Sequence, residues 1–269
     1  MNQIPIATSC KSLNQRVKVG QHLMENRCGV NILIEIEYDG TNYSGWQYQP
    51  NKRTIQGELE KALRQIGQAK IKIIGASRTD AGVSALEQIA NFHISAMQFK
   101  NIPSFRNGIN ALLPNDIYVR KMKIIAKEFH SRYSSKGKVY LYQIITEQSP
   151  LRKKFAWVLP YELDLSKMRN AAKLFVKHDD YKLFCSVKDK NGMVLMKSIK
   201  INKATDEIYI KIEANRFLYK MVRRIVGALV EIGRGHRTEY DIMKGLAGEK
   251  HRPLICAPAN GLILVKVKY

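Results

Sequence analysis

The chain has 269 residues, of which 45% are hydrophobic and 25% are charged, so its composition is that of a folded globular protein and excludes an intrinsically disordered one. No run approaches the roughly 18 apolar residues of a membrane-spanning helix. The four cysteines are scattered, without the paired spacing of a zinc site or a disulfide framework. The sequence therefore predicts a soluble, cytoplasmic protein with no membrane association and no bound metal.

The whole chain has a net charge of +22, and the positive charge is concentrated in its second half. Residues 1–120 hold 14 Lys/Arg and 9 Asp/Glu, whereas residues 121–269 hold 31 Lys/Arg and 14 Asp/Glu. This asymmetry predicts that an anionic polymer binds mainly to the C-terminal half. A lysine-rich composition that only keeps the protein in solution is the alternative. A membrane surface is disfavoured, because no basic amphipathic helix with a clean apolar face is present.

Residues 1–28 show neither strand nor helix periodicity and carry four Lys/Arg against one acidic residue. They lack the apolar core of a secretory signal. We expect a disordered N-terminal extension, or a start of translation assigned upstream of Met24. The rest of the chain is expected to form an N-terminal lobe over residues 29–123 and a basic C-terminal lobe over residues 124–269.

The N-terminal lobe opens with apolar residues at every second position of 32–38, which predicts a half-buried strand. In the aromatic loop 41–50 that follows, Trp46 is expected to pack, whereas Tyr43 could either pack or stack on a base. Thr54 is expected to cap a helix whose apolar face is formed by Ile55, Leu59, Leu63 and Ile66. The later elements are predicted to be a strand over 70–74, a strand through 90–94, a helix from Pro103-Ser104 to before Leu113, and a strand over 117–123.

The C-terminal lobe is predicted to contain both strands and helices. Strands are expected over 138–144, in a hairpin of 199–201 with 208–212, and over 262–267; helices are expected from Asp164 or Ser166 onward, from about Phe217 to Ile232, and over 240–246. Gly227, inside the long helix, costs about 1 kcal/mol relative to alanine, which indicates that something packs tightly against it. Because strands and helices do not strictly alternate, the fold class is α+β, with mixed or antiparallel sheets flanked by helices.

The turn Gly75-Ala-Ser-Arg-Thr-Asp-Ala-Gly-Val-Ser-Ala85 holds the candidate catalytic group. A strand delivers Arg78 and Asp80 into this turn, and the residues around them are small enough for another molecule to approach the backbone. A carboxylate in a crevice with an arginine two residues away is a candidate nucleophile or general base. The same pattern also fits an ordinary glycine-bounded turn whose aspartate caps its own backbone.

The string Arg78-Thr-Asp-Ala-Gly-Val83 resembles the signature of the tRNA pseudouridine synthase A family, in which the aspartate is catalytic. The resemblance assigns that role to Asp80 and places Arg78 beside the substrate. It recurs in order over roughly residues 30–269, for example in Tyr38-Asp-Gly-Thr-Asn-Tyr-Ser-Gly-Trp-Gln47, and is therefore more specific than one short string. The chain departs from the family at Ser84, where histidine is usual, and this difference concerns local packing or substrate contact.

Tyr140 and Tyr142 lie on one predicted strand and point to the same face, because they alternate with Val139 and Leu141. Two core tyrosines are the structural alternative. The segment resembles the family's paired tyrosines, which implies that the ring of Tyr140 lies against the target uracil, where stacking contributes roughly 1–3 kcal/mol. A tyrosine beside Asp80 could also relay the proton that leaves carbon 5 of the uracil ring.

The predicted helix over 217–232 carries a polar stripe at helical spacing, formed by Arg216, Tyr219, Lys220, Arg223 and Gly227. A solvated face is the usual interpretation, and Lys220 is a possible RNA contact. The segment Met221-Val-Arg-Arg-Ile-Val-Gly227 resembles a family motif whose arginine pairs with the catalytic aspartate. This assigns the pairing to Arg223, and such a partner favours the charged carboxylate and fixes its position.

Two more segments, 129–134 and 261–264, resemble the family. In the first, His130 and Arg132 are possible contacts to RNA phosphates. In the second, the resemblance implies that Leu262 contacts the bound base, although this leucine would also serve as plain core.

The resemblance implies an isomerase that converts uridine to pseudouridine at positions 38, 39 and 40, in the anticodon stem-loop of tRNA. It also implies a two-lobed pseudouridine synthase fold with the active cleft between the lobes, a homodimer, and no metal or other cofactor. Two rival functions are an RNA-binding protein that kept the fold without activity and a glycoside hydrolase, which also cleaves a glycosidic bond. A hydrolase needs two carboxylates across one cleft, and the Asp80 turn offers one beside an arginine.

Overall fold

The computed structural model describes residues 29–67, 71–95, 101–177, 179–185, 191–249 and 252–269. The extension expected over residues 1–28 lies outside the described residues. In the described ranges, no helix is both long enough and apolar enough to cross a membrane.

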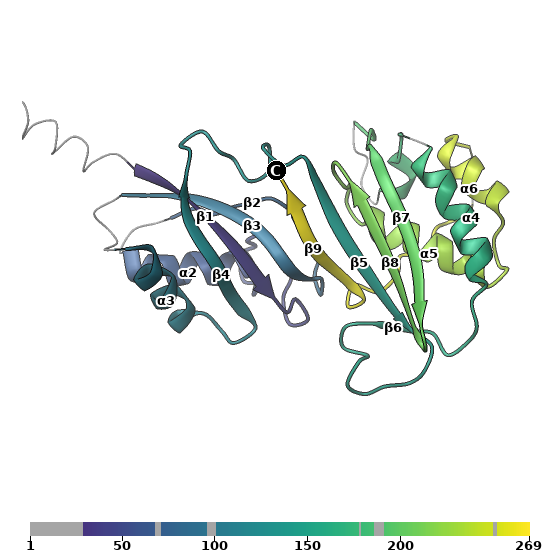
Figure 1. Cartoon of the computed structure of the whole chain (residues 1–269), viewed down its shortest axis with the longest axis horizontal. Coiled ribbons are helices and arrows are strands. Elements are labelled where there is room, and N and C mark those ends of the chain that lie inside the picture. Colours follow the sequence, from purple (N-terminus) through teal and green to yellow (C-terminus); the bar gives the residue numbers. More distant parts are fainter. Residues whose placement is uncertain (1–28, 68–70, 96–100, 178, 186–190, 250–251) are drawn as a thin grey trace, which may run out of the picture.

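One mixed sheet runs through the described part of the molecule (Figure 1), with its strands in the order β4-β1-β3-β9-β5-β8-β7. The long neighbours are antiparallel except β3 and β9, which run parallel, and the short β2 and β6 pair with β3 and β5. The last strand therefore joins the two halves of the sheet. The strands are β1 (Gly29–Tyr38), β2 (Ile74–Gly75), β3 (Ser84–Ser95), β4 (Ile117–Ile125), β5 (Gly137–Ile145), β6 (Trp157–Val158), β7 (Met196–Ala204), β8 (Glu207–Ala214) and β9 (Leu262–Lys268).

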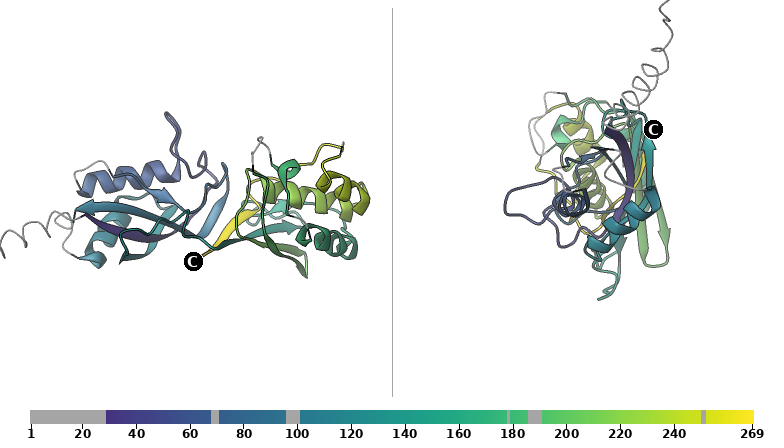
Figure 2. Two further views of the ribbon diagram at one scale, coloured as in Figure 1. Left: turned by 90° about the horizontal axis from the view of Figure 1, so that it is seen from above. Right: turned by 90° about the vertical axis from the view of Figure 1, so that its left-hand side faces the viewer.

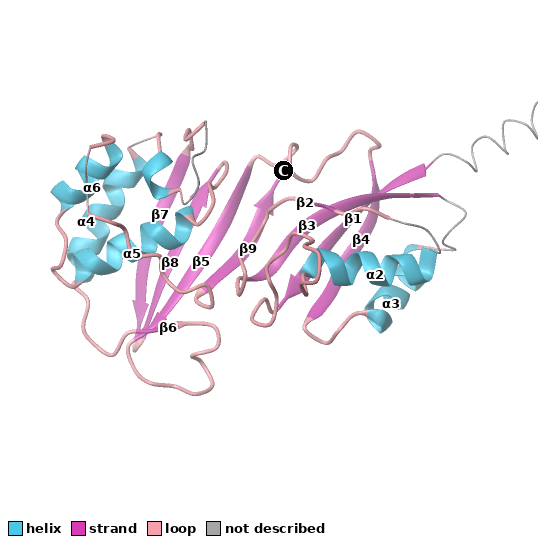
Figure 3. Ribbon diagram, turned by 180° about the vertical axis from the view of Figure 1, so that it is seen from behind, coloured by secondary structure: helices cyan, strands magenta, loops and turns pink. Residues whose placement is uncertain are grey.

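The helices gather in two groups at opposite ends of the sheet (Figures 2 and 3). One group is α2 (Ile55–Gly67) and α3 (Ile102–Leu112), where α3 contacts both α2 and β4. The other is α4 (Leu165–Val176), α5 (Met221–Gly233) and α6 (Glu239–Leu246), with the short 3-10 helix η2 (Lys182–Phe184) beside α5. Strands β9 and β5 lie between the groups. The fold is α+β, as predicted, and the division into lobes over 29–123 and 124–269 stays a proposal.

The apolar positions of the sequence pattern are the buried ones. In β1, Ile32, Ile34 and Ile36 are at most 1% exposed, and they share one hydrophobic cluster with Leu59 and Leu63 of α2. Burial of each such side chain contributes roughly 1.5–3 kcal/mol. The amphipathic pattern, more than intrinsic helix propensity, therefore accounts for the position of α2 in the fold.

The strand was expected over 70–74, of which residue 70 lies outside the described residues; among residues 71–75, ladder pairing is confined to β2. Immediately upstream, the backbone N–H of Ile73 donates to Glu60 Oε1 at 3.0 Å, and its carbonyl accepts from Gln56 Nε2 at 3.2 Å. Side chains of α2 thus occupy the backbone groups that a longer strand would pair. The apolar alternation here reflects burial without strand pairing.

The long helix begins at Met221 and not at Phe217 as expected. Lys220 has φ 59°, in the left-handed region, and a left-handed residue interrupts a right-handed helix. Upstream, the side chain of Asn215 accepts a 2.9 Å hydrogen bond from the backbone N–H of Leu195, the residue immediately before β7. Residues 215–220 therefore form a loop between β8 and α5.

The predicted polar stripe on one face of a single helix is therefore wrong. Arg216, Tyr219 and Lys220 lie on the loop, whereas Arg223 lies on α5. Gly227 is buried inside α5, and a Cβ atom there would stand 2.1 Å from the carbonyl oxygen of Ile255. The expectation that something packs tightly against Gly227 is confirmed, and the partner is the backbone before β9.

Candidate active site

A second loop supports the Asp80 turn from behind. The turn connects β2 to β3, and the backbone N–H of Trp46 donates to its Thr79 carbonyl at 3.1 Å. In return, Gly82 N donates to Tyr43 O at 3.2 Å. The hydroxyls of Tyr38 and Thr79 share a 2.8 Å hydrogen bond. The aromatic loop over 41–50 is therefore a support for the turn, and Trp46 packs as expected, with 1% of its surface exposed.

Tyr43, which the sequence left open, is also a packing residue. Its ring is buried, its hydroxyl donates to the Asp116 carboxylate, and Arg53 Nη2 donates to that hydroxyl at 2.8 Å. The guanidinium carbon of Arg53 lies 4.3 Å from the ring centroid. Burial and the nearby Asp116 charge raise the pKa of Tyr43 above its usual value, so its hydroxyl stays protonated. Asp116 and Arg53 thus fix the position of the loop through their contacts with Tyr43.

Gly45 is required where the two loops touch. It has φ +93°, and a Cβ atom there would lie 2.7 Å from the Thr79 carbonyl oxygen and 3.1 Å from the Asp80 carbonyl carbon. Only glycine adopts this backbone conformation readily and leaves room for the opposite chain. The position of Asp80 therefore depends on a residue 35 positions earlier in the sequence.

Asp80 is held by an arginine of helix α5. Arg223 Nη1 donates to Asp80 Oδ2 at 3.0 Å, and the two side chains are 15% and 12% exposed. Arg223 Nε donates to the carbonyl of Ala257 at 2.7 Å. A charge-assisted hydrogen bond to a fixed guanidinium restrains the position of the carboxylate. The neighbouring Arg224 instead binds the carbonyls of Leu183 and Cys185.

Tyr140 lies beside this ion pair, on β5. Its hydroxyl shares a 2.7 Å hydrogen bond with Ser77 Oγ, and its ring packs edge-on against Phe217 with 5.1 Å between centroids. Burial, followed by the Asp80 charge, raises the pKa of Tyr140 to about 12, and the Ser77 hydrogen bond only partly opposes this. At neutral pH the phenol is therefore protonated and can donate a hydrogen bond. Tyr142 is core, with its hydroxyl bonded to the Pro258 carbonyl at 2.8 Å.

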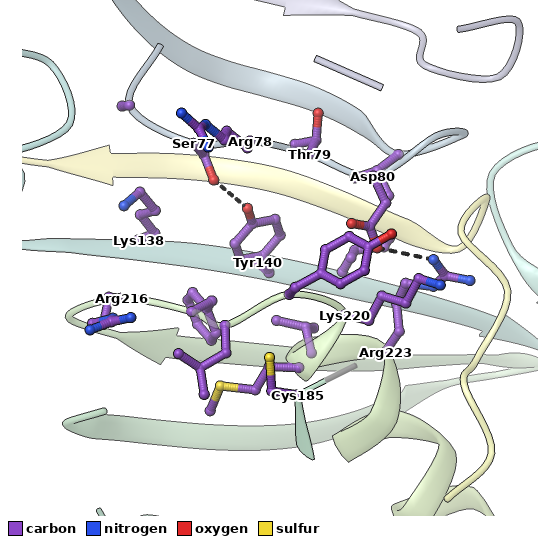
Figure 4. A pocket seen from close by; sticks show the side chains of 18 of the residues that line it. Ser77, Arg78, Thr79, Asp80, Lys138, Tyr140, Cys185, Arg216, Lys220 and Arg223 are labelled. Carbon is purple, nitrogen blue, oxygen red and sulfur yellow. Dashed lines mark hydrogen bonds and ion pairs between the residues drawn. The ribbon is translucent and has the colours of Figure 1, made fainter. Parts of the chain in front are cut away.

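These groups line a cavity of about 970 Å³ (Figure 4). The predicted site residues that line it are Asp80, Arg78, Tyr140, Arg223, Leu262, Arg132 and Lys220. Among the described lining residues Asp80 is the single carboxylate, whereas six residues carry positive charge: Arg78, Arg132, Lys138, Arg216, Lys220 and Arg223. The cavity therefore suits an anionic ligand. It does not present the two carboxylates of a glycoside hydrolase within its described walls.

Lys220 and His130 occupy different settings. The ammonium group of Lys220 lies 5.1 Å from the centroid of the Tyr219 ring, at the cavity wall. His130 is outside the lining, where its Nδ1 accepts hydrogen bonds from the backbone of Arg132 and Tyr133 at 3.2 and 3.3 Å. His130 therefore stabilises the turn that presents Arg132 to the cavity.

Ser84 is buried at the start of β3 and does not line the cavity. Its hydroxyl accepts a 3.0 Å hydrogen bond from Gly40 N. A Cβ atom on Gly40 would stand 2.0 Å from the carbonyl oxygen of Val83, so the two segments are in close contact here. In this chain the position contributes to local packing.

Most of the other lining residues were not assigned to the site from the sequence, among them Ser77, Lys138 and Phe217. Lys138 shares a strand face with Tyr140, two residues away, so the period-two argument already applied to the tyrosines contained the signal. Phe217 was hidden because its segment was read as helix. Nothing in the local pattern distinguishes Ser77 from an ordinary turn serine. No cluster of His, Cys, Asp and Glu suited to a metal occurs among the residues that the structure describes.

Comparison with known proteins adds an independent line of evidence. A family model described as tRNA pseudouridine synthase matches residues 34–134 and 171–269. The tRNA pseudouridine synthase A of Thermoanaerobacter pseudethanolicus is 40% identical over 248 residues, covering 89% of this chain and 99% of the relative. The protein of the same name from Aquifex aeolicus is 38% identical over 242 residues, covering 88% and 98%. The tRNA pseudouridine synthase A 2 of Clostridium perfringens is 37% identical over 246 residues, covering 89% and 99%.

Proposed function

The chain belongs to the tRNA pseudouridine synthase family and is an isomerase that converts uridine to pseudouridine in tRNA, and on this premise we propose that Asp80 is its catalytic residue. The single observation that carries the proposal is the Asp80–Arg223 ion pair at the wall of a cationic cavity. We also propose that the substrate uridines are those at positions 38, 39 and 40 of the anticodon stem-loop, as the resemblance of the sequence implies.

The reaction is redox-neutral and conserves every atom of the nucleotide. The bond from C1′ of the ribose to N1 of uracil breaks, the uracil turns, and a bond from C1′ to C5 forms. C5 loses its proton and N1 gains one. Because no electron or group is exchanged with another molecule, this chemistry requires no cofactor. Asp80 acts on the target nucleotide as nucleophile or base after the base leaves the helical stack, a movement that costs a few kcal/mol.

The remaining side chains of the site bind and orient the nucleotide. Tyr140 stacks on the uracil, which offsets part of the cost of extruding the base. Leu262, 5% exposed at the start of β9, contacts the base from the same side of the sheet. Arg78 lies two residues before Asp80 on an exposed part of the turn, where it contacts the RNA. The lysine- and arginine-rich surface, mainly that of residues 124–269, holds phosphates with an affinity that falls as salt increases.

The proposal extends to the assembly of the protein. The active cleft lies between the two lobes, because Asp80 comes from residues 29–123 and Arg223 from residues 124–269. The protein works as a homodimer in the cytoplasm, where tRNA is processed. Light scattering coupled to size-exclusion chromatography tests the dimer, and a mass corresponding to one chain would contradict it.

Pseudouridine mapping on unmodified tRNA tests the function. The wild-type protein is expected to form pseudouridine at positions 38–40, and Asp80→Asn is expected to form none while binding tRNA within a few fold of wild type. Asp206→Asn is a matched control, since Asp206 lies in the turn between β7 and β8, pairs with Arg152 and does not line the cavity. A normal product yield from Asp80→Asn would remove Asp80 from the chemistry. Binding without product from the wild-type protein would favour the RNA-binding rival.

A further inference from the structure

One end of the cavity is lined by cations that the isomerisation does not use. Figure 4 shows Lys138 and Arg216 at one end and the Asp80–Arg223 pair at the other, with Tyr140 and Ser77 between them. Arg132 lines the same cavity. These residues come from the turn before β5, from β5 itself and from the loop between β8 and α5. Three separate segments thus present positive charge to one end of the cavity.

Lys138 is the unusual member of this group. It is 8% exposed, and no carboxylate of the described residues forms an ion pair or hydrogen bond with it. Burial first, and then the charges of Arg132 and Arg216, lower its pKa to about 8. A buried cation without an opposite charge is costly, and folded proteins normally pair such groups. The missing partner is therefore expected to come from a ligand.

Strand β5 also fixes the distance between this cation and the catalytic end. Lys138, Tyr140 and Tyr142 are spaced by two residues and share a face of the strand. A rise of about 3.3 Å per residue places Lys138 about 7 Å along the strand from Tyr140, on the side away from Tyr142. Tyr142 lies near Arg223, whose charge lowers the pKa of that phenol against the larger effect of burial. A nucleotide with its base at Tyr140 therefore has Lys138 within reach of its backbone along the strand.

We propose that Lys138, with Arg132 and Arg216, forms a subsite for one phosphodiester of the RNA strand beside the target uridine. The inference rests on the proposed function, which places that uridine at the Asp80 end. A phosphodiester oxygen accepts a charge-assisted hydrogen bond from the Lys138 ammonium group, and the guanidinium groups can engage two oxygens at once. The phosphate supplies the negative charge that Lys138 lacks. A phosphate bound at Lys138 thereby fixes the position of the target base relative to Tyr140 on β5.

Salt-dependent binding of a labelled anticodon stem-loop RNA to the full-length protein tests the subsite. Lys138→Met is expected to bind about tenfold more weakly than wild type and to lower the slope of log affinity against log salt by about 0.7–0.9, the value of one lost phosphate contact. Lys203→Met is the matched control, because Lys203 is exposed near the far end of the β7–β8 hairpin and does not line the cavity. An unchanged slope in Lys138→Met would overturn the proposal.

Replacing single phosphates by neutral methylphosphonates identifies the contact. Wild type is expected to lose about tenfold in affinity at one phosphate beside the target uridine, and Lys138→Met is expected to lose nothing further at that phosphate. Lys138→Arg keeps the charge and is expected to retain the wild-type slope and the wild-type sensitivity, which separates charge from any damage to folding. If each methylphosphonate weakens binding by the same factor in Lys138→Met as in wild type, Lys138 contacts none of the phosphates tested.

Product analysis of the same complexes separates this inference from the proposed function. If wild type forms no pseudouridine while the slope still differs between wild type and Lys138→Met, the proposed function fails and the phosphate subsite stands. If wild type forms pseudouridine and the two slopes agree, the proposed function stands and the subsite fails.

Discussion

Asp80 Oδ2 and Arg223 Nη1 lie 3.0 Å apart although 143 residues separate them along the chain. The aspartate sits in the turn between β2 and β3, and the arginine sits in the first turn of α5. The Nε atom of Arg223 also donates a hydrogen bond to the carbonyl of Ala257, which lies in the segment before β9. The pair forms only when β9 joins the two halves of the sheet, so the site and the sheet are assembled together.

Arg223→Ala is expected to slow the chemical step by about 100-fold or more, because the Asp80 carboxylate loses the group that orients it. Arg223→Lys should recover only part of the rate, since one ammonium group does not reproduce the contacts to both Asp80 and Ala257. Single-turnover kinetics at saturating tRNA measures this step. Arg234→Ala is the control at the other end of the same helix, because Arg234 is exposed and does not line the cavity. Unchanged kinetics in Arg223→Ala would remove this residue from the site.

Tyr140→Phe separates stacking from proton transfer. The variant keeps the ring that packs against Phe217 and loses the hydroxyl bonded to Ser77. If the hydroxyl relays the C5 proton, the chemical step should slow by about 100-fold with tRNA affinity unchanged, as for a lost acid–base group. Tyr140→Leu should in addition weaken binding by the roughly 1–3 kcal/mol of base stacking. A single-turnover rate of Tyr140→Phe within threefold of wild type would limit Tyr140 to stacking.

Two glycines with positive φ give a matched comparison. Gly235→Ala has open space around the new methyl group, so it is expected to lower the free energy of unfolding by only about 1–2 kcal/mol and to leave activity unchanged. Gly45→Ala meets the Thr79 carbonyl at 2.7 Å in addition to the backbone strain. It should destabilise the protein more and reduce product formation at least tenfold, because the Asp80 turn must move. Urea unfolding and single-turnover assays measure both effects, and equal behaviour of the two variants would contradict the supporting role of the loop.

The lowered pKa of Lys138 predicts a pH dependence of RNA binding. With a pKa reduced from 10.5 to about 8 by burial, Arg132 and Arg216, the lysine is charged below pH 8 and increasingly neutral above it. Wild-type affinity for the stem-loop RNA should therefore fall as the pH rises from about 7 to 9, and bound phosphate should shift the fall upward by favouring the charged form. Lys138→Met should lack this step. Fluorescence anisotropy at constant ionic strength measures it, and parallel pH curves would contradict the assignment.

The same pKa has a consequence for stability. Because the folded value lies below the unfolded one, the unfolded chain binds the proton more tightly between pH 8 and 10.5. The contribution of Lys138 to the free energy of unfolding should therefore increase as the pH rises through this interval. Urea unfolding of wild type and Lys138→Met at pH 7.5 and 9.5 checks the sign. Because the variant lacks the buried charge, its free energy of unfolding should exceed that of wild type, and this difference should be smaller at pH 9.5 than at pH 7.5.

Local pattern was sufficient for most elements. The alternation in β1 and in β5, and the apolar stripe of α2, identified strands and a helix because their burial follows from spacing alone. Pattern failed where side chains or tertiary contacts replaced the regular ladder. Ile73 is bonded to side chains of α2 instead of a neighbouring strand, and the left-handed conformation of Lys220 delays the start of α5 to Met221.

The sequence by itself determined the α+β class, the Asp80 turn and the family, because ordered motifs and periodicity are properties of neighbouring residues. Tertiary structure decided which distant residues meet. It brought Arg223 to Asp80, showed that Gly45 supports the Asp80 turn, and placed Lys138 in the cavity without a carboxylate partner among the described residues. The physical reason is that ion pairing, burial and close backbone contact depend on distances through space, and these are fixed only when β9 pairs with both β3 and β5.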